Sequence, residues 1–236
     1  MRESRKRTIA VVLLVVGACV GPPLWANVTY DFKGITANDP SGQAVAVGEK
    51  AFYVTVSDPG VPERVLFTFG VRMGFPYTLP DGTEDVSYNI DGVYFYDGVL
   101  LNEGIVELID ASNTGDPDVD FTKDATPAEL SGYSPEPLLS CIADADGDPP
   151  TGGPKGNGVN VGEELGVLFA LDTGKTYADV ITGMNAGTIV VGIKAQGFGE
   201  YSEGFITTTI PAPGALLLGS LGLGLLGQVR RRRILS

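Results

Sequence analysis

Apolar side chains recur at every second position in several short stretches of the chain, and turn-forming residues lie between them. The clearest stretches are residues 52–57, 65–69 and 167–171. Period-2 patterning with apolar residues on both faces indicates strands that are sandwiched or half covered. Further candidate strands are residues 28–32, 87–90, 92–96, 105–110, 137–142, 189–195 and 204–208.

Short turn signals built from Asp, Gly and Pro separate these candidate strands. Many short strands with such turns predict a mainly β fold, an antiparallel β-sandwich of jelly-roll-like type. Residues 113–160 are rich in Pro, Gly and Asp and predict extended loops. The turn signals are Asp58-Pro59-Gly60, Asp81-Gly82, Asp91-Gly92 and Asp97-Gly98.

One short helix is predicted within this β-rich body. Thr176 can cap its start, Asp179 stands at the third helical position, and Gly187 ends it. The apolar stripe predicts a structural lid over an edge or end of the sandwich. Its members, spaced at i, i+3, i+4 and i+7, are Tyr177, Val180, Ile181 and Met184.

The C-terminal end of the chain carries an uncharged apolar stretch, residues 214–229, followed by an arginine cluster. At ~1.5 Å per residue this stretch gives a helix of roughly 24 Å, a little under the ~30 Å hydrocarbon core of a bilayer. It predicts a transmembrane helix whose basic flank stays in the cytoplasm. A buried helix of a soluble domain is the alternative, but it predicts a polar face, and only Ser220 and Gln228 are polar here. The cluster consists of Arg230, Arg231, Arg232 and Arg233.

The N-terminal end, residues 1–26, has the pattern of a secretory signal peptide with a signal helix. Four basic residues precede an apolar core at residues 9–16, and a Pro-Pro break comes before Ala26, where we expect cleavage. The alternative is a lipoprotein box ending at Cys19, which would then carry the lipid. The chain therefore divides into residues 1–26, an exported domain at 27–209 and an anchor segment at 210–236.

The predicted exported domain is strongly acidic. Eight of the 16 Lys and Arg residues lie in the two terminal segments, which leaves eight in the domain against 28 Asp and Glu. This imbalance argues against nucleic acid or another anionic surface as a partner. Calcium, a cationic matrix and simple solubility remain as explanations of the charge.

The residues that catalysis commonly uses are scarce. The chain has no histidine, and Cys141 is alone once Cys19 leaves with the leader. Catalytic triads that contain histidine and metal sites with imidazole ligands are therefore excluded, and we expect no enzyme activity. A glycosidase that uses a carboxylate pair is the alternative that sequence does not test.

Two acidic clusters have the alternate spacing that lets several carboxylates converge on a hard cation such as Ca²⁺. The first is Asp144, Asp146 and Asp148, and the second is Asp116, Asp118 and Asp120. Neither matches the EF-hand, because Lys155 stands where the first cluster would need a bidentate glutamate. A solvated acidic loop is the alternative for both, so we expect no cofactor, with Ca²⁺ as the one candidate.

The tail, with Pro211, Ala212, Pro213 and Gly214 before the apolar stretch and the arginines, resembles the PEP-CTERM sorting signal. Ala212 stands where that family has glutamate. The resemblance implies recognition by an exosortase-type protease or transpeptidase and a link to extracellular polysaccharide. Residues 92–101, 158–171 and 178–198 also resemble segments of PEP-CTERM proteins whose bodies have no assigned activity.

We therefore expect an exported protein anchored in the inner membrane through its C-terminus, with its body on the periplasmic side or, later, at the cell surface or in the extracellular matrix. The expected role is structural or interactive, without catalysis. The alternative is a surface-displayed module that binds carbohydrate or Ca²⁺. An exposed planar row of Tyr94, Tyr96 or Tyr133 would favour sugar binding, and burial of these rings would favour the structural role.

Overall fold

The computed structural model describes residues 27–96, 101–110, 119–123, 129–133, 140–145 and 157–208. The predicted leader, the apolar stretch 214–229 and the Asp97-Gly98 turn lie outside these residues. In chain order the elements are β1 (Val28–Gly34), α1 (Gln43–Ala51), β2 (Phe52–Ser57), β3 (Arg64–Val71), β4 (Tyr77–Thr78), β5 (Glu84–Asp85), β6 (Asn89–Tyr96), β7 (Leu101–Asp110), β8 (Phe121–Lys123), β9 (Ser140–Ala145), β10 (Glu164–Leu171), α2 (Tyr177–Ala186), β11 (Val190–Phe198) and β12 (Tyr201–Thr207).

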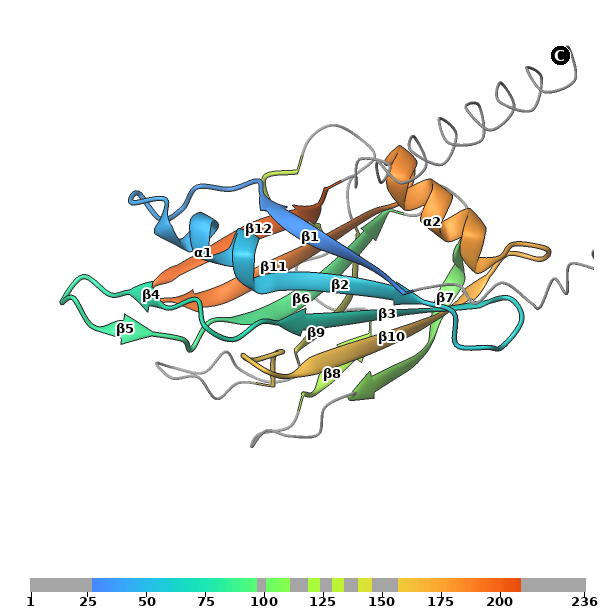
Figure 1. The fold of residues 1–236 in the computed structure, drawn as a ribbon, viewed down its shortest axis with the longest axis horizontal. Coiled ribbons are helices and arrows are strands. Elements are labelled where there is room, and N and C mark those ends of the chain that lie inside the picture. The colour runs from blue at the N-terminus through green and yellow to red at the C-terminus, as the bar shows by residue number, and fades with distance from the viewer. Residues whose placement is uncertain are drawn as a thin grey trace, which may run out of the picture.

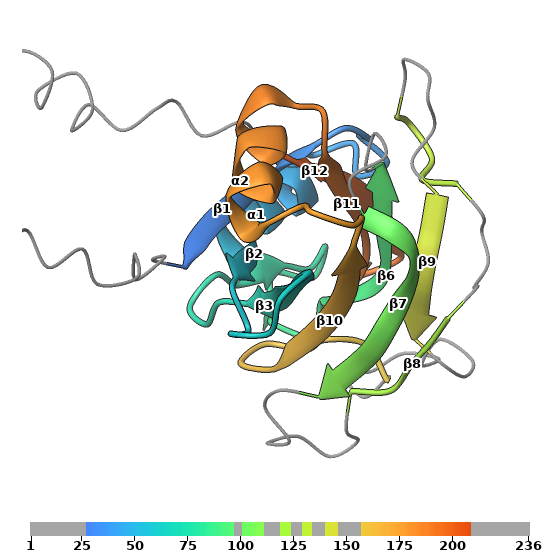
Figure 2. The same ribbon diagram turned by 90° about the vertical axis from the view of Figure 1, so that its right-hand side faces the viewer.

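The fold is mainly β, as the alternation predicts. Ten of the described strands form one sheet in the order β7-β10-β3-β2-β1-β12-β11-β6-β9-β8, and neighbouring strands in it are antiparallel. The sheet curls so that its two halves enclose a common interior (Figure 1, Figure 2). The small β4–β5 hairpin lies at one end of the sheet, and α2 lies toward the other (Figure 1).

Strand β1 joins the two halves of the sheet. Its residues Val28–Asp31 pair with β2, and Phe32–Gly34 pair with β12. The halves meet in the interior through aromatic rings, because Phe95 of β6 lies 4.9 Å from both Phe67 of β3 and Phe169 of β10, measured between centroids. Edge-to-face and tilted contacts of this kind add specific geometry to the burial of apolar area.

The alternating positions of the sequence account for the core. Phe52, Val54 and Val56 of β2 are fully buried, whereas the residues between them are half-buried. The ring of Phe52 sits edge-on to those of Tyr88 and Phe205, with centroids 5.8 and 5.2 Å away. The inward face of each strand thus supplies the apolar burial that stabilises the fold.

The predicted helix is confirmed as α2. The Asp179 carboxylate accepts hydrogen bonds from the N–H and the hydroxyl of Thr176, both at 2.8 Å, in a capping box. Gly187 ends the helix in the left-handed conformation, with φ 72°. Tyr177, Val180 and Met184 are buried, so the apolar stripe faces the sheet.

A second helix, α1, was not predicted, so the expectation of one helix was wrong. Its buried residues are Ala44, Val47, Gly48 and Ala51, which have helical spacing but small side chains. It packs on β1 and β12, and a Cβ at Gly48 would overlap the ring of Phe205. The close approach therefore requires glycine at the point where the helix crosses that ring.

Two other expectations need correction. The Asp91-Gly92 pair is not a turn but lies inside β6, because Asp91 is the extra residue of a bulge opposite Lys194 and Ala195. The region 113–160 contains β8 and β9, so it is not loop throughout. The Asp81-Gly82 turn is confirmed between β4 and β5, where Gly82 has φ 86°.

No helix among the described residues is long and apolar enough to cross a membrane.

Candidate functional site

The outer face of β1, β2, β3 and β10 carries polar residues in cross-strand rows. In the first row, threonines of three neighbouring strands stand directly opposite one another. The second row contains charged and aromatic residues. The hydroxyls of Thr29 and Thr55 lie 2.9 Å apart. The first row is Thr29, Thr55 and Thr68, and the second is Asp31, Tyr53, Gly70 and Glu164.

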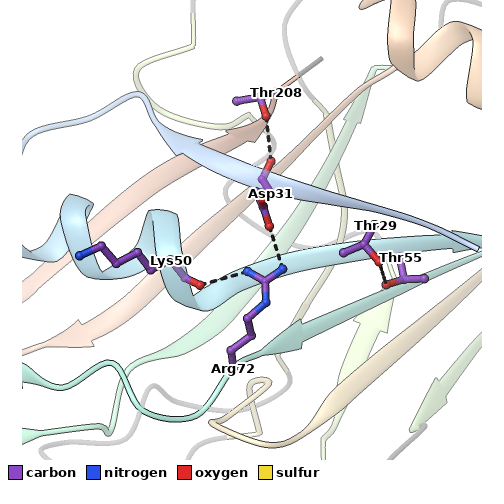
Figure 3. A network of polar contacts seen from close by, with 6 residues as sticks. All are labelled: Thr29, Asp31, Lys50, Thr55, Arg72 and Thr208. Atoms are coloured by element: carbon purple, nitrogen blue, oxygen red, sulfur yellow. Dashed lines mark hydrogen bonds and ion pairs between the residues drawn. The ribbon is translucent and has the colours of Figure 1, made fainter. Parts of the chain in front are cut away.

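Arg72 connects this face to α1 (Figure 3). Its guanidinium lies 2.7 Å from Asp31 Oδ1, donates to the carbonyl of Lys50 at 3.0 Å and covers the Tyr53 ring at 4.8 Å. The side chains of Arg72 and Asp31 are 36% and 63% exposed, so solvent limits this ion pair to about 0–1 kcal/mol. Because the guanidinium covers the Tyr53 ring, that ring is not free to stack on a ligand.

Tyr53 is held from its other end as well. Its hydroxyl donates to Glu164 Oε1 at 2.7 Å, and the ring lies across Gly70, where a Cβ would overlap it. Burial, followed by the hydrogen bond to Glu164, raises the pKa of Tyr53 to about 12. Arg72, Asp31, Lys50, Tyr53 and Glu164, which we call the Arg72 network, thus link the three strands β1, β2 and β10 to α1.

A pocket of about 490 Å³ lies between two turns, the one joining β2 to β3 and the one leading from β10 into α2. Glu63 has φ 55°, and its carboxylate and carbonyl accept hydrogen bonds from the N–H groups of Gly174 and Leu171, at 3.0 and 2.9 Å. Of the charged lining residues, Asp58, Glu63 and Lys175 are exposed and Arg64 is half-buried. This pocket is open and mixed in charge, and Glu63 serves to join its two turns.

A smaller pocket lies beside residues 129–133, which we call the strap. The strap packs on the outer face of the sheet, where Leu130 and the fully buried Tyr94 form a separate apolar cluster. Gly204 of β12 permits this approach, because a Cβ there would lie 3.2 Å from the carbonyl oxygen of Ser131. The strap pocket has a volume of about 130 Å³.

Glu203 forms one boundary of the strap pocket and is 1% exposed. Its Oε1 accepts the N–H of Asp39 at 2.7 Å, and its Oε2 accepts the hydroxyl of Thr36. The Thr36 hydroxyl oxygen in turn accepts the N–H of Gly204 at 2.7 Å. A buried carboxylate requires such partners, and this arrangement fixes the loop after β1 to β12.

Asp39 is the second buried carboxylate and is 3% exposed. Burial acts to raise its pKa, but hydrogen bonds from the Ala44 N–H and from Ser41 outweigh burial, and the pKa is lowered. The Ala44 N–H, at 2.9 Å, belongs to the first turn of α1. Asp39 therefore caps the unpredicted helix from outside it.

Lys194 of β11 forms another boundary of the strap pocket. Its ammonium lies 2.6 Å from Asp91 Oδ2, and Gln196 donates to the other oxygen of the same carboxylate at 2.9 Å. The side chain of Lys194 is 33% exposed. The bulge at Asp91 thus places a neutralised charge pair on the outer face.

The tyrosines proposed as a sugar platform do not form an exposed row. Tyr94 is buried, and Tyr96 and Tyr133 are half-buried and pack in the cluster under the strap. By the criterion set from the sequence, this arrangement favours the structural role.

The predicted metal clusters are only partly described. Asp144 lies in β9 and pairs with Gly92, so it does not belong to a loop as expected. Asp146, Asp148, Asp116 and Asp118 lie outside the described residues, and the Asp120 N–H donates to Asn157. Within the described ranges, no three acidic or cysteine side chains converge as metal ligands. Ca²⁺ therefore remains the one candidate beside the expectation of no cofactor.

The sorting motif and its arginines also fall outside the described residues. They are Pro211, Ala212, Pro213, Gly214, Arg230, Arg231, Arg232 and Arg233.

Sequence reasoning missed Asp39, Glu203 and the Lys194–Asp91 pair. One signal was present for Glu203, because it shares the inward face of β12 with Phe205, two positions away, where alternation calls for an apolar residue. The partners of Glu203 lie more than 160 positions earlier in the chain, and no local pattern reveals them.

Comparison with known proteins gave no match to a family model, to a curated protein or to a solved structure.

Proposed function

We propose that the protein is an exported domain held at the inner membrane by residues 214–229, with a structural or interaction role in the envelope or extracellular matrix and no catalysis. The observation that supports this most is the placement of the two ends of the β-rich body. The Thr208 N–H donates to the carbonyl of Asp31, and β1 begins three residues before Asp31. A leader and an anchor can therefore both join the body from one side.

The opposite end of the body is then the part presented away from the membrane. It carries the β4–β5 hairpin, which lies next to the start of β12, since Gly199 approaches Leu79 and Tyr77. The exposed side chains of Met73 and Val86 flank this hairpin in the chain. A tether at one end and a free surface at the other suit an interaction module better than a buried active site.

The finer parts of the proposal concern fold type and tail. The curled sheet is best classified as a jelly-roll-like sandwich, in which β1 passes from one layer to the other.

Residues 1–26 form a cleaved signal helix, and residues 214–229 form a transmembrane helix. An exosortase-type enzyme recognises the tail through residues 211–214, and extracellular polysaccharide is a further partner. The order of proline motif, apolar stretch and arginines supports this assignment.

The alternative role, a surface-displayed ligand-binding module, has one observation in its favour. The strap pocket is a preformed hollow with polar groups around it. The Arg72 network and the buried tyrosine cluster support the structural role, because their polar and aromatic groups contact one another.

Fractionation of cells that express tagged protein tests the location. We expect the full chain in the membrane fraction, with its body digested by protease added to the periplasmic side. A variant that lacks residues 210–236 should move to the soluble periplasmic fraction. As a matched control, Val61→Ser alters a side chain that is 54% exposed and should leave the location unchanged.

A body protected from periplasmic protease in intact spheroplasts, or a truncated variant that stays with the membrane, would contradict the proposal. Mass spectrometry of the cell-associated protein tests the processing steps separately. It distinguishes an N-terminus at Asn27 from a lipidated Cys19, and an intact tail from one cut near residues 211–214.

A further inference from the structure

We propose that the strap pocket binds an uncharged, hydroxyl-rich ligand, through the edge of one sugar-sized ring. This inference goes beyond the proposed anchoring and does not depend on it. It rests on the size of the pocket, on the donors and acceptors at its wall, and on the neutralisation of its charges.

The size of the pocket limits the ligand. Its volume of about 130 Å³ corresponds to about four water molecules at ~30 Å³ each. That is below the ~300–1,000 Å³ of pockets that enclose drug-sized ligands. The pocket therefore admits part of a small ring with its hydroxyl groups, not a whole oligomer.

The wall offers hydrogen-bond donors. An ammonium has three N–H groups, and among the described residues that of Lys194 is bonded to one carboxylate, that of Asp91. Ser131 and Ser202, each of which carries a hydroxyl group, belong to the same lining. These donors come from the strap and from two neighbouring strands, so they approach the hollow from different sides.

Acceptors stand beside these donors. Asn38 lines the pocket and uses its amide nitrogen to donate to the carbonyl of Ser202 at 2.6 Å, which leaves the amide oxygen as an acceptor. The buried Tyr94 and Leu130 add an apolar wall. A ligand hydroxyl both donates and accepts, and the C–H groups of a sugar ring suit an apolar wall.

The charges of the pocket argue against an ionic ligand. Lys194 is paired with Asp91, and both oxygens of Asp91 and of Glu203 already accept hydrogen bonds. An anion would find the Lys194 ammonium already paired, and a cation would find no carboxylate oxygen that lacks a partner among the described contacts. An uncharged ligand avoids both costs.

The pocket is also preformed. Glu203 is fixed by Thr36 and Asp39, and the strap is held close to Gly204. Because these groups are ordered before a ligand arrives, binding costs little conformational entropy.

Titration calorimetry of the full chain in phosphocholine micelles, a detergent without a sugar headgroup, tests the proposal. The probes are methyl glycosides of glucose, galactose, mannose and N-acetylglucosamine, with glucuronate and glucosamine as charged counterparts. We expect at least one neutral probe to bind at millimolar concentration, with the charged counterparts about tenfold weaker.

Variants locate the site. Removing a single ligand hydrogen bond with Ser202→Ala or Ser131→Ala should weaken binding about two- to tenfold. Lys194→Met should weaken it in the same range, and Lys33→Met, an exposed lysine on β1, is the matched control. An unchanged thermal midpoint shows that each variant is folded.

Three outcomes would overturn the proposal. They are no binding of any neutral probe at tens of millimolar, tighter binding of a charged counterpart, or unchanged affinity in the folded Ser202→Ala, Ser131→Ala and Lys194→Met variants.

Discussion

The backbone N–H of Asp39 donates a 2.7 Å hydrogen bond to Oε1 of Glu203, which lies 164 positions later in the chain. Through this contact the loop between β1 and α1 is joined to β12. Both carboxylates are almost fully buried, and each is surrounded by hydrogen-bond donors. Long-range polar contacts of this kind are costly to break, because each partner left behind is buried without water.

Replacing Glu203 should therefore destabilise the fold strongly. Glu203→Ala leaves the Thr36 hydroxyl and the Asp39 N–H without their acceptor, and we expect a loss of about 2–4 kcal/mol in the free energy of unfolding. Glu203→Gln keeps one acceptor oxygen and should lose about half as much. Urea denaturation at neutral pH measures both values. Equal stabilities of wild type and Glu203→Ala would show that this contact contributes nothing.

Buried tyrosines should make the protein sensitive to alkali. Burial is the main cause that raises the pKa of Tyr30, Tyr53 and Tyr88 to about 12, from an ordinary value of 10.0. Between these pH values the folded state keeps phenol protons that the unfolded state releases, so stability falls as pH rises from 10 to 12. Below pH 10 this contribution is fully present.

The urea midpoint followed through this pH range checks the tyrosine prediction. Tyr53→Phe should make the decline shallower by one titrating group. The phenolate absorbance of the native protein should rise late for at least six of its nine tyrosines, because the pKa values of Tyr77, Tyr177 and Tyr201 are raised as well. A phenolate signal that rises fully near pH 10 while the protein is folded would contradict the raised pKa values.

Two glycines should respond differently to the same added methyl group. In Gly48→Ala the methyl overlaps the ring of Phe205, which is fully buried. Over-packing costs about 1–3 kcal/mol, which outweighs a helix-propensity gain of about 1 kcal/mol. In Gly70→Ala the half-buried Tyr53 can swing outward, at a cost of about 0.5–1.5 kcal/mol for its hydrogen bond to Glu164.

Thermal and urea unfolding should thus show a loss of stability in both variants, with a different aromatic side chain obstructing the added methyl group in each. Phe205→Leu removes the two nearest of the atoms that a Cβ at Gly48 would meet and leaves Phe52 Cε2 at 2.9 Å, so the added methyl group should cost less in the Phe205→Leu background than in wild type. Additive losses in the double variant would show that the ring is not the obstacle.

Substitutions at the start of α2 should have a smaller effect on the free energy of unfolding, because they alter only the cap of that helix. Thr176→Ala removes a hydroxyl that donates to Asp179, and we expect a loss of about 1 kcal/mol. Thr176→Ser keeps the hydroxyl and should stay within a few tenths of a kcal/mol of wild type. Urea denaturation distinguishes the two, and an equal loss in both variants would point to the threonine methyl instead.

Calcium should leave the thermal midpoint of the full chain unchanged at millimolar concentration. The reason is that Asp144 is in β9, so its backbone is committed to sheet pairing and is not shaped by a cation-binding loop. A clear rise in the midpoint with Ca²⁺, absent with Asp146→Asn, would instead support the predicted acidic site.

Strong local patterns allowed the sheet and one helix to be predicted. The alternation at residues 52–57 corresponds to β2, and Thr176, Asp179 and Gly187 marked the limits of α2. Helix α1 gave a weak signal because its buried face is made of alanine, valine and glycine. Asp91-Gly92 has turn composition but occupies a bulge, which only its pairing with β11 reveals.

The candidate sites were harder to predict than the fold. Glu203, Thr36 and Asp39 meet only when β12 pairs with β1, and the strap pocket needs residues from five separate parts of the chain. Conversely, the expectations for the two termini depend on local composition, and they remain predictions about residues outside the described part.

The double pairing of β1 bears on how the chain reaches its native state. Since β12 is the last of the described strands to be synthesised and pairs with β1, the first of them, the sheet cannot close until nearly all of the body is available. Such non-local pairing slows folding and leaves the edges of β1 and β11 open for a time. A chaperone that shields strand edges would therefore help most during the interval before β12 docks.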